Sequence, residues 1–138
     1  MNDFNAQVID EFRANEGRVA GPFEGYPMVL VHHVGRRSGD EHVSPMMYLP
    51  GDDGVIYVFA SKAGAPTDPD WYHNLAAVDS AEIEVGTERY AVDVAEETGA
   101  DRDRIYAKQA ELYPGFAEYE EKTAGIRVIP VLRLTRTT

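Results

Sequence analysis

Cysteine is absent from the 138 residues, so thiol catalysis and a disulfide framework are both excluded. Long apolar runs are missing too, because no stretch approaches the ~20 consecutive apolar residues that span a bilayer. The first residues show neither the basic start nor the apolar run of a signal peptide. We therefore expect a cytoplasmic protein.

Positive charge is scarce. The chain has 13 Lys and Arg residues against 24 Asp and Glu, which gives a formal net charge of −11. Such a field repels nucleic acid and anionic lipid, so neither is expected as a partner. An anionic ligand would need a local concentration of cations. Between Val19 and Glu88 the only Lys or Arg residues are Arg36, Arg37 and Lys62, and this isolation marks them as candidates.

Familiar catalytic signatures are also missing. The sequence has no Walker loop, no G-x-G-x-x-G loop and no G-x-S-x-G elbow around Ser38 or Ser61, which leaves nucleotide and serine hydrolysis without support. His32 and His33 are neighbours in a predicted strand, so their side chains point to opposite faces. No zinc spacing is present, and we expect no metal site.

Hydrophobic periodicity predicts the secondary structure. Phe4, Val8 and Phe12 lie four residues apart and predict an amphipathic helix over about residues 3–16. This helix would cover an open side of a sheet, with a membrane-surface role as the less favoured alternative. Pro45 cannot donate to a ladder, which places its strand at an edge or a bulge. Strands are predicted over 26–34, 42–49, 55–61, 81–85, 89–94 and 126–134, and further helices over 71–77, 101–113 and 116–122.

Short connections between successive strands favour antiparallel pairing, since parallel strands need crossover helices. Strands in the centre with helices at the periphery predict an α+β barrel or sandwich in one domain over residues 1–138.

The stretch ASKAGAPTDPDWYHNL, residues 60–75, is the part that the rest of the chain is organised around. A small-residue loop carrying Lys62 leads into a helix for which Asp68 is the predicted N-cap, and the single Trp, Trp71, opens that helix. Such a loop offers backbone N–H groups and a point charge to an anion. Together with Arg36 and Arg37 at a hairpin tip, Lys62 could converge on one anionic group.

Tyr113, Phe116 and Tyr119 are spaced by three, which gathers three aromatic rings on one side of a helical turn. Two interpretations are open: the rings pack as core, or they wall a pocket for a planar ligand.

The segments GRRSGDEHVSPMMYL, YVFASKAGAPTDPDWYHNLAA, YPGFAEY and IPVLRL together resemble the deazaflavin (coenzyme F420)-dependent nitroreductase family, over about Val29 to Leu134. The resemblance implies a flavin-reductase-like split β-barrel. It also implies binding of coenzyme F420, an 8-hydroxy-5-deazaflavin with a phosphate and an oligoglutamate tail.

By this resemblance the cofactor would be lined by Val31, His32, His33, Arg36, Arg37, Ser38, Gly39, Asp40, Glu41, His42, Val58, Phe59, Ala60, Ser61, Lys62, Trp71, Tyr72 and Asn74. The catalytic positions would be Tyr48, Ser61, Tyr113 and Tyr119. Phe116 replaces the tyrosine of the nitroimidazole-reducing member, and His32 and His33 replace small hydroxyl residues. We expect these changes to shift substrate range rather than cofactor binding.

The resulting hypothesis is an F420-dependent reductase that transfers a hydride from the reduced coenzyme to a planar quinone, enone or nitroaromatic acceptor. The alternatives are an FMN-dependent oxidoreductase of the same barrel class and an F420-binding carrier without catalysis. Split barrels of this kind are often dimeric, so a homodimer is also an open alternative.

Overall fold

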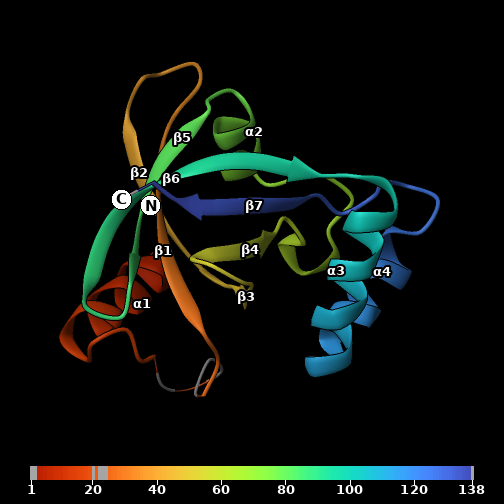
Figure 1. Ribbon diagram of the computed structural model, residues 1–138, viewed down its shortest axis with the longest axis horizontal. Coiled ribbons are helices and arrows are strands. Elements are labelled where there is room, and N and C mark those ends of the chain that lie inside the picture. The colour runs from red at the N-terminus through yellow and green to blue at the C-terminus, as the bar shows by residue number, and fades with distance from the viewer. Residues whose placement is uncertain (1–2, 20, 22–24, 138) are drawn as a thin grey trace.

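The computed structural model describes residues 3–19, 21 and 25–137. These residues form seven strands and four α-helices, together with a short 3₁₀ turn at residues 62–64 (Figure 1). In chain order the elements are α1 (Asp3–Ala14), β1 (Met28–Val34), β2 (Glu41–Met47), β3 (Leu49–Pro50), β4 (Val55–Phe59), η2 (Lys62–Gly64), α2 (Asp70–Ala76), β5 (Ser80–Val85), β6 (Glu88–Glu97), α3 (Gly99–Leu112), α4 (Gly115–Thr123) and β7 (Val131–Arg136).

The strands form one sheet in the order β2-β1-β5-β6-β7-β4-β3. Every pairing in it is antiparallel, which confirms the predicted α+β class. The two outer strands, β2 and β3, are separated in the chain by Tyr48 alone, so the sheet curls back on itself (Figure 1). Pro45 lies on β2 opposite Leu30, and its edge position confirms the prediction made from its missing N–H group.

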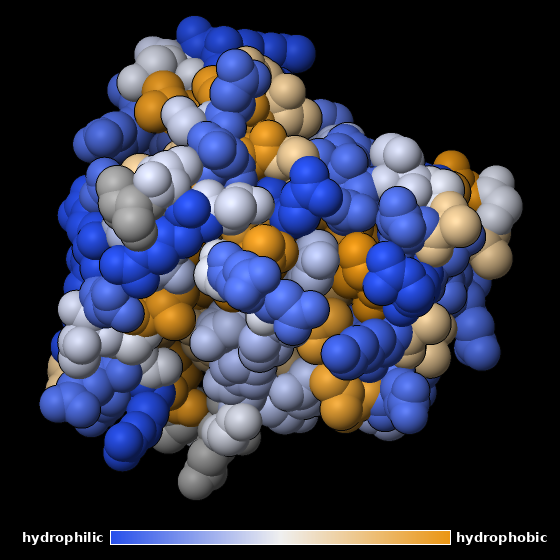
Figure 2. All heavy atoms as spheres, in the orientation of Figure 1, coloured by the Kyte–Doolittle hydropathy of each residue, from blue (hydrophilic) through white to orange (hydrophobic). Residues whose placement is uncertain are grey.

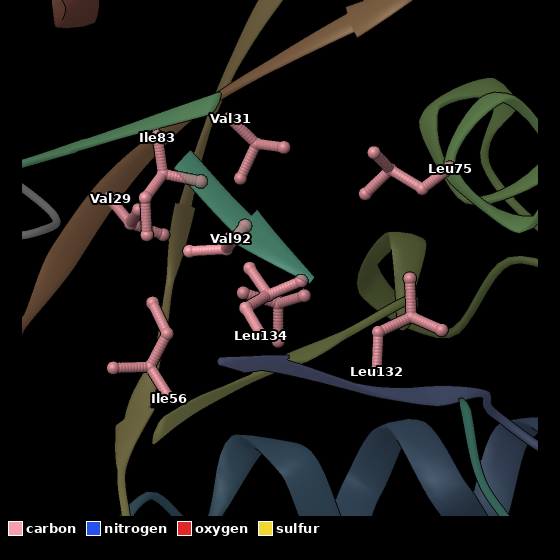
Figure 3. Close-up of a cluster of buried hydrophobic side chains, with 9 residues drawn as sticks. Val29, Val31, Ile56, Leu75, Ile83, Val92, Leu132 and Leu134 are labelled. Carbon is pink, nitrogen blue, oxygen red and sulfur yellow. The ribbon is translucent and has the colours of Figure 1, made fainter. Parts of the chain in front are cut away.

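The main core fills the inside of this curled sheet. Figure 3 shows side chains from β1, β4, β5, β6 and β7 pointing toward one another, with Leu75 of α2 closing one end. Each fully buried side chain of this size stabilises the fold by roughly 1.5–3 kcal/mol. Alternation along β1 explains the arrangement, because Val29 and Val31 face this core while Met28 and Leu30 pack under α1.

The helices cover the remaining surfaces. Phe12 of α1 packs on the outer face of the sheet, and Arg13 of the same helix donates two hydrogen bonds to Glu84 of β5, at 3.2 and 2.8 Å. At the other end, α3 and α4 lie side by side (Figure 1) over a second core built around Phe59 and Tyr106. The predicted N-terminal helix therefore covers the sheet as expected.

Several predicted boundaries are wrong. The return strand over 42–49 is broken at Tyr48, where the chain leaves β2 for β3. The last strand begins at Val131 rather than at residue 126, because the N–H groups of Ile126 and Arg127 donate to the carbonyl oxygen of Thr123 at the end of α4, at 2.9 and 3.0 Å. The remaining predicted strands differ from the observed ones by one to three residues at their ends.

The face drawn in Figure 2 is mainly hydrophilic, with hydrophobic residues in separate groups. Among the described helices, none combines the length and the apolar character that crossing a membrane requires.

Candidate functional site

A cleft of about 440 Å³ lies between α2 and the tip of the β1-β2 hairpin, residues 35–40. Its described lining residues are Asn5, His33, Gly35, Arg36, Arg37, Ser38, His42, Val43, Ser44, Asp70, Trp71 and Asn74. The tip is tight: the N–H of Gly35 donates to the carbonyl oxygen of Asp40 at 2.8 Å, and a Cβ at residue 35 would lie 2.5 Å from Oγ of Ser38. Glycine at this position therefore allows the compact turn on which Arg36 and Arg37 lie.

Asn74 fixes Arg36 in the cleft. The backbone N–H and the Nη1 group of Arg36 both donate to Oδ1 of Asn74, each at 3.1 Å. Arginine can only donate, so this contact requires the amide oxygen on that side. Nδ2 of Asn74 then donates to Nδ1 of His33 at 2.9 Å, and Nε2 of His33 is left to donate to Oγ of Ser44 at 2.8 Å. This series of hydrogen bonds selects the tautomer of His33 that carries its proton on Nε2.

Burial is the main reason that the pKa of His33 is lowered to about 4, and positive charge on His42 and His32 lowers it further. Only 8% of the residue is exposed. At neutral pH His33 is therefore uncharged, which its acceptor role toward Asn74 requires. His33 serves this network as a neutral hydrogen-bonding group and adds no charge to the cleft.

The charges of the two arginines are weakly compensated. The carboxylate nearest to Arg36 is Asp70, at 3.9 Å, and its side chain is 90% exposed. Arg37 has no ion pair or hydrogen bond with any described residue. Most other arginines of this acidic chain pair with carboxylates at 3.3 Å or less. Positive charge is thus left available at the cleft, as an anionic ligand would need.

A second feature is the loop that follows β4. Ser61 has right-handed helical dihedrals, and Lys62, Ala63 and Gly64 follow with φ of 47, 53 and 82°. Left-handed conformations at two successive non-glycine residues are strained by about 1 kcal/mol or more each. A right-handed residue followed by a left-handed one makes a backbone nest, in which successive N–H groups point into one concavity.

Arg127 holds this loop from behind. Its guanidinium donates to the carbonyl oxygens of Ala60, Ser61 and Ala65 at 3.1, 2.9 and 3.0 Å, and to the carboxylate of Asp68 at 2.7 Å. About 10% of the Arg127 side chain is exposed. The prediction of Asp68 as the cap of α2 is wrong for this reason, since Pro69 occupies that position without a side-chain cap.

The cations lie along the segment Thr67–Asp70. Nζ of Lys62 donates to Oγ1 of Thr67 at 3.2 Å, Arg127 binds Asp68, and Arg36 lies near Asp70. Lys62 is not among the described residues that line the cleft. Lys62 and Arg36 therefore lie at the two ends of this segment, which suits an elongated anion with more than one charged group.

The third feature is the aromatic group on α3 and α4. Phe116 is buried, and its ring contacts those of Phe59 and Tyr119 with centroids 5.7 and 5.3 Å apart. Tyr113 is half-buried and meets the ring of Tyr26 edge-on at 5.2 Å. Phe116 is thus a core residue, and only the two tyrosines beside it are exposed enough to face a ligand.

The family model that matches residues 6–136 is described as F420H(2)-dependent quinone reductase. The chain belongs to this family. An F420H(2)-dependent quinone reductase of Mycobacterium tuberculosis (strain H37Rv) is 32% identical over 131 residues, which cover 91% of this chain and 85% of that protein.

Two solved structures agree with this family. The structure of an F420-H2 dependent reductase (FDR-A) is 32% identical and has a TM-score of 0.69, over 78% of this chain and 93% of that one. A chain described as a domain-swapped dimer is 30% identical with a TM-score of 0.70, over 94% and 92%. The curled sheet is therefore the split β-barrel of the F420-dependent reductases.

The residues predicted from the family resemblance lie in several parts of the structure. His33, Arg36, Arg37, Ser38, His42, Trp71 and Asn74 line the cleft, and Ser61 and Lys62 form the loop behind β4. Val31, Val58, Phe59 and Ala60 are buried, so any contact there would come from backbone. His32 and Tyr72 bind Glu84 and Glu96 outside the cleft, Tyr48 packs against the main core, and Gly39, Asp40 and Glu41 are exposed near the hairpin tip.

Sequence reasoning missed Arg127 and Ser44. Arg127 lies 59 residues or more from each of its partners in the chain, and Ser44 reaches His33 across the hairpin. Neither carries a motif. The isolation of a cation, which singled out Lys62, gave no signal for Arg127 because other basic residues lie near it in the sequence.

Proposed function

We propose that this chain is a reductase that takes coenzyme F420H2 as its hydride donor and a planar, electron-poor compound of the quinone class as its acceptor. The observation that carries the proposal is the weakly compensated charge of Arg36, which Asn74 holds, and of Arg37 beside it, in a cleft of a strongly acidic protein of this family. The coenzyme is acidic, and the only strong local attraction for it in the described cleft comes from these residues.

The donor set fits such a ligand. Guanidinium groups and the hydroxyl of Ser38 match phosphate and carboxylate oxygens, and Trp71 adds an apolar wall to the same cleft. When bound, the reduced deazaflavin supplies a hydride, while the protein supplies binding, orientation and electrostatics.

The chain's own groups then have separate tasks. Arg36 and Arg37 bind anionic oxygens at the hairpin tip, and Lys62 does so at the loop after β4. We assign the half-buried Tyr113 and Tyr119 to the wall that orients the acceptor. Burial raises the pKa of Tyr48, so its hydroxyl stays protonated and able to donate a hydrogen bond. The family resemblance implies that this position lies near the reacting face.

Two titrations test this proposal. The purified protein is titrated with oxidised F420 and, in parallel, with flavin mononucleotide, and ligand fluorescence is followed at low and physiological salt. We expect tight, salt-sensitive binding of the deazaflavin alone. Preference for flavin mononucleotide would show that the protein uses this flavin in place of F420. If the protein binds F420H2 but no quinone, enone or nitro compound oxidises it, the protein is a carrier without catalysis.

We also propose that the chain forms a homodimer. A structural relative of 30% identity is described as a domain-swapped dimer, and this chain has two outer strands, β2 and β3, on which a second copy could pair. Light scattering on the eluting protein measures the mass directly. A mass near 15.3 kDa would contradict a dimer.

A further inference from the structure

We propose that Arg127 is a positioning residue, which shapes the Ser61–Ala63 backbone into a nest for a phosphate group without touching that group itself. The inference rests on the proposed function for the source of the phosphate, namely the coenzyme. It adds Arg127, which is at least 59 residues away from this loop in the sequence, and a backbone site that is separate from the arginine cleft.

Arg127 has little capacity left for a ligand. A guanidinium carries five N–H donors, and four of them are used on Ala60, Ser61, Ala65 and Asp68. The carboxylate of Asp68 also balances its charge at 2.7 Å. A buried, neutralised arginine of this kind is a structural clamp, whereas Lys62 beside it keeps an exposed ammonium group.

The clamp decides where the loop's N–H groups point. In a trans peptide the C=O of one residue and the N–H of the next point in opposite directions. Because the carbonyls of Ala60 and Ser61 turn toward Arg127, the N–H groups of Ser61 and Lys62 turn away from it. The N–H groups of residues 61–63 have no acceptor among the described residues, although Gly64 and Ala65 donate back into the loop. The N–H groups of Ser61 and Lys62 therefore face away from Arg127, and that of Ala63 is a third adjacent donor without an acceptor among the described residues.

The nest is held in place from two sides. On one side Arg127 offsets the strain of the left-handed Lys62 and Ala63. On the other side α4 lies against Gly64 so closely that an added Cβ would meet Cδ of Lys122 at 2.8 Å. Lys122 is thus a second lysine packed beside the loop. Preorganised N–H donors of this kind bind an anion without first having to be ordered.

The test uses ¹⁵N-labelled full-length protein titrated with inorganic phosphate. In the wild type we expect the amide signals of Ser61, Lys62 and Ala63 to shift. Arg127→Lys keeps the charge but loses the planar fork, so it should lose these shifts and bind F420 roughly tenfold more weakly. Arg133→Lys is the matched control, since Arg133 on β7 is about half exposed and pairs with Glu97 at 2.6 Å, away from the loop after β4, and it should behave as the wild type.

Asp68→Asn provides a second variant in case Arg127→Lys does not fold, because it leaves the three carbonyl contacts available and should keep the phosphate shifts. Phosphate shifts confined to the hairpin tip in the wild type, or full shifts in folded Arg127→Lys, would overturn the inference. F420 binding without any change at residues 61–63 would overturn it while leaving the proposed function intact. Phosphate shifts at the nest without F420 binding would support the nest and refute the coenzyme.

Discussion

Lys62 carries its positive charge on an exposed side chain, whose one hydrogen bond within the described part of the chain is donated to Thr67 at 3.2 Å. Lys62→Ala should therefore weaken F420 binding roughly tenfold, as the loss of a charged hydrogen bond does, and leave the free energy of unfolding within about 0.5 kcal/mol. Fluorescence titration and urea unfolding measure the two quantities. Lys108→Ala on α3, also exposed, is the control with the same change in net charge, and equal affinities of both variants would refute the assignment.

His33 makes the stability of the fold depend on pH. Its pKa is about 4 in the folded protein and about 6.5 when unfolded, so the unfolded chain binds more protons between these values. The stability from neutral His33 is fully present above pH 6.5 and is lost as pH falls toward 4, by up to about 3 kcal/mol. His33→Gln should flatten the slope of unfolding free energy against pH in that window.

The histidine signals in an NMR titration provide the independent readout for this pH dependence. His33 should remain neutral at pH 5 in the wild type, and a midpoint near 6.5 would show that burial beside Asn74 and Ser44 does not hold it neutral.

The hydrogen bonds of the site residues also show what could not be predicted from the sequence, namely which uncharged side chains are their partners. Arg36 and Lys62 were found because they are isolated cations. Their uncharged partners gave no such signal: Asn74 was predicted through the family resemblance alone, and Thr67 was not predicted.

Most strands and helices could be predicted, because apolar residues recur in them at the spacing of a helix or a strand. The sheet direction followed from short connections, and the edge position followed from Pro45. What could not be predicted depends on particular hydrogen bonds. The predicted last strand extended back to residue 126, but the N–H groups of residues 126 and 127 bond to Thr123 at the end of α4. Arg127 binds Asp68 and so removes it from its expected capping role, which requires the loop after β4 to lie nearby.

The contact between η2 and α4 can be tested by glycine substitution. Gly64 has φ of 82°, and an added Cβ would lie 2.8 Å from Cδ of Lys122 and 3.3 Å from Cα of Tyr119. Gly125 has a similar φ of 78° but nothing within 4 Å of the added atom. Gly125→Ala should cost about 1 kcal/mol of unfolding free energy through backbone strain alone, and Gly64→Ala about 1–2 kcal/mol more through overpacking.

Urea unfolding of the two alanine variants measures that difference, and F420 titration adds a second comparison. Gly64→Ala should also weaken coenzyme binding because it displaces the loop that carries Lys62, whereas Gly125→Ala should bind normally. Equal losses of stability would mean that α4 moves aside without strain. The close packing of η2 on α4 would then have no part in holding the loop.

At the scale of the whole molecule, the net charge of −11 opposes the local charge of the site. An approaching polyanion first meets the overall negative field, and only within about one Debye length, roughly 8 Å at physiological salt, does it meet Arg36, Arg37 and Lys62. Salt should therefore raise both rate constants, and the two increases act on affinity in opposite directions. It screens the long-range repulsion and speeds association, but it also weakens the close ion pairs and speeds dissociation.

Stopped-flow fluorescence with F420 between about 0.02 and 0.2 M salt separates these effects. The association rate constant should rise several-fold with salt while the affinity falls, because dissociation accelerates more than association. Arg37→Gln should flatten the salt dependence of dissociation and leave that of association nearly unchanged, since one charge in a field of −11 matters little at long range. An association rate that falls with salt would mean that the cations of the site already govern the approach, and that the acidic surface does not hinder it.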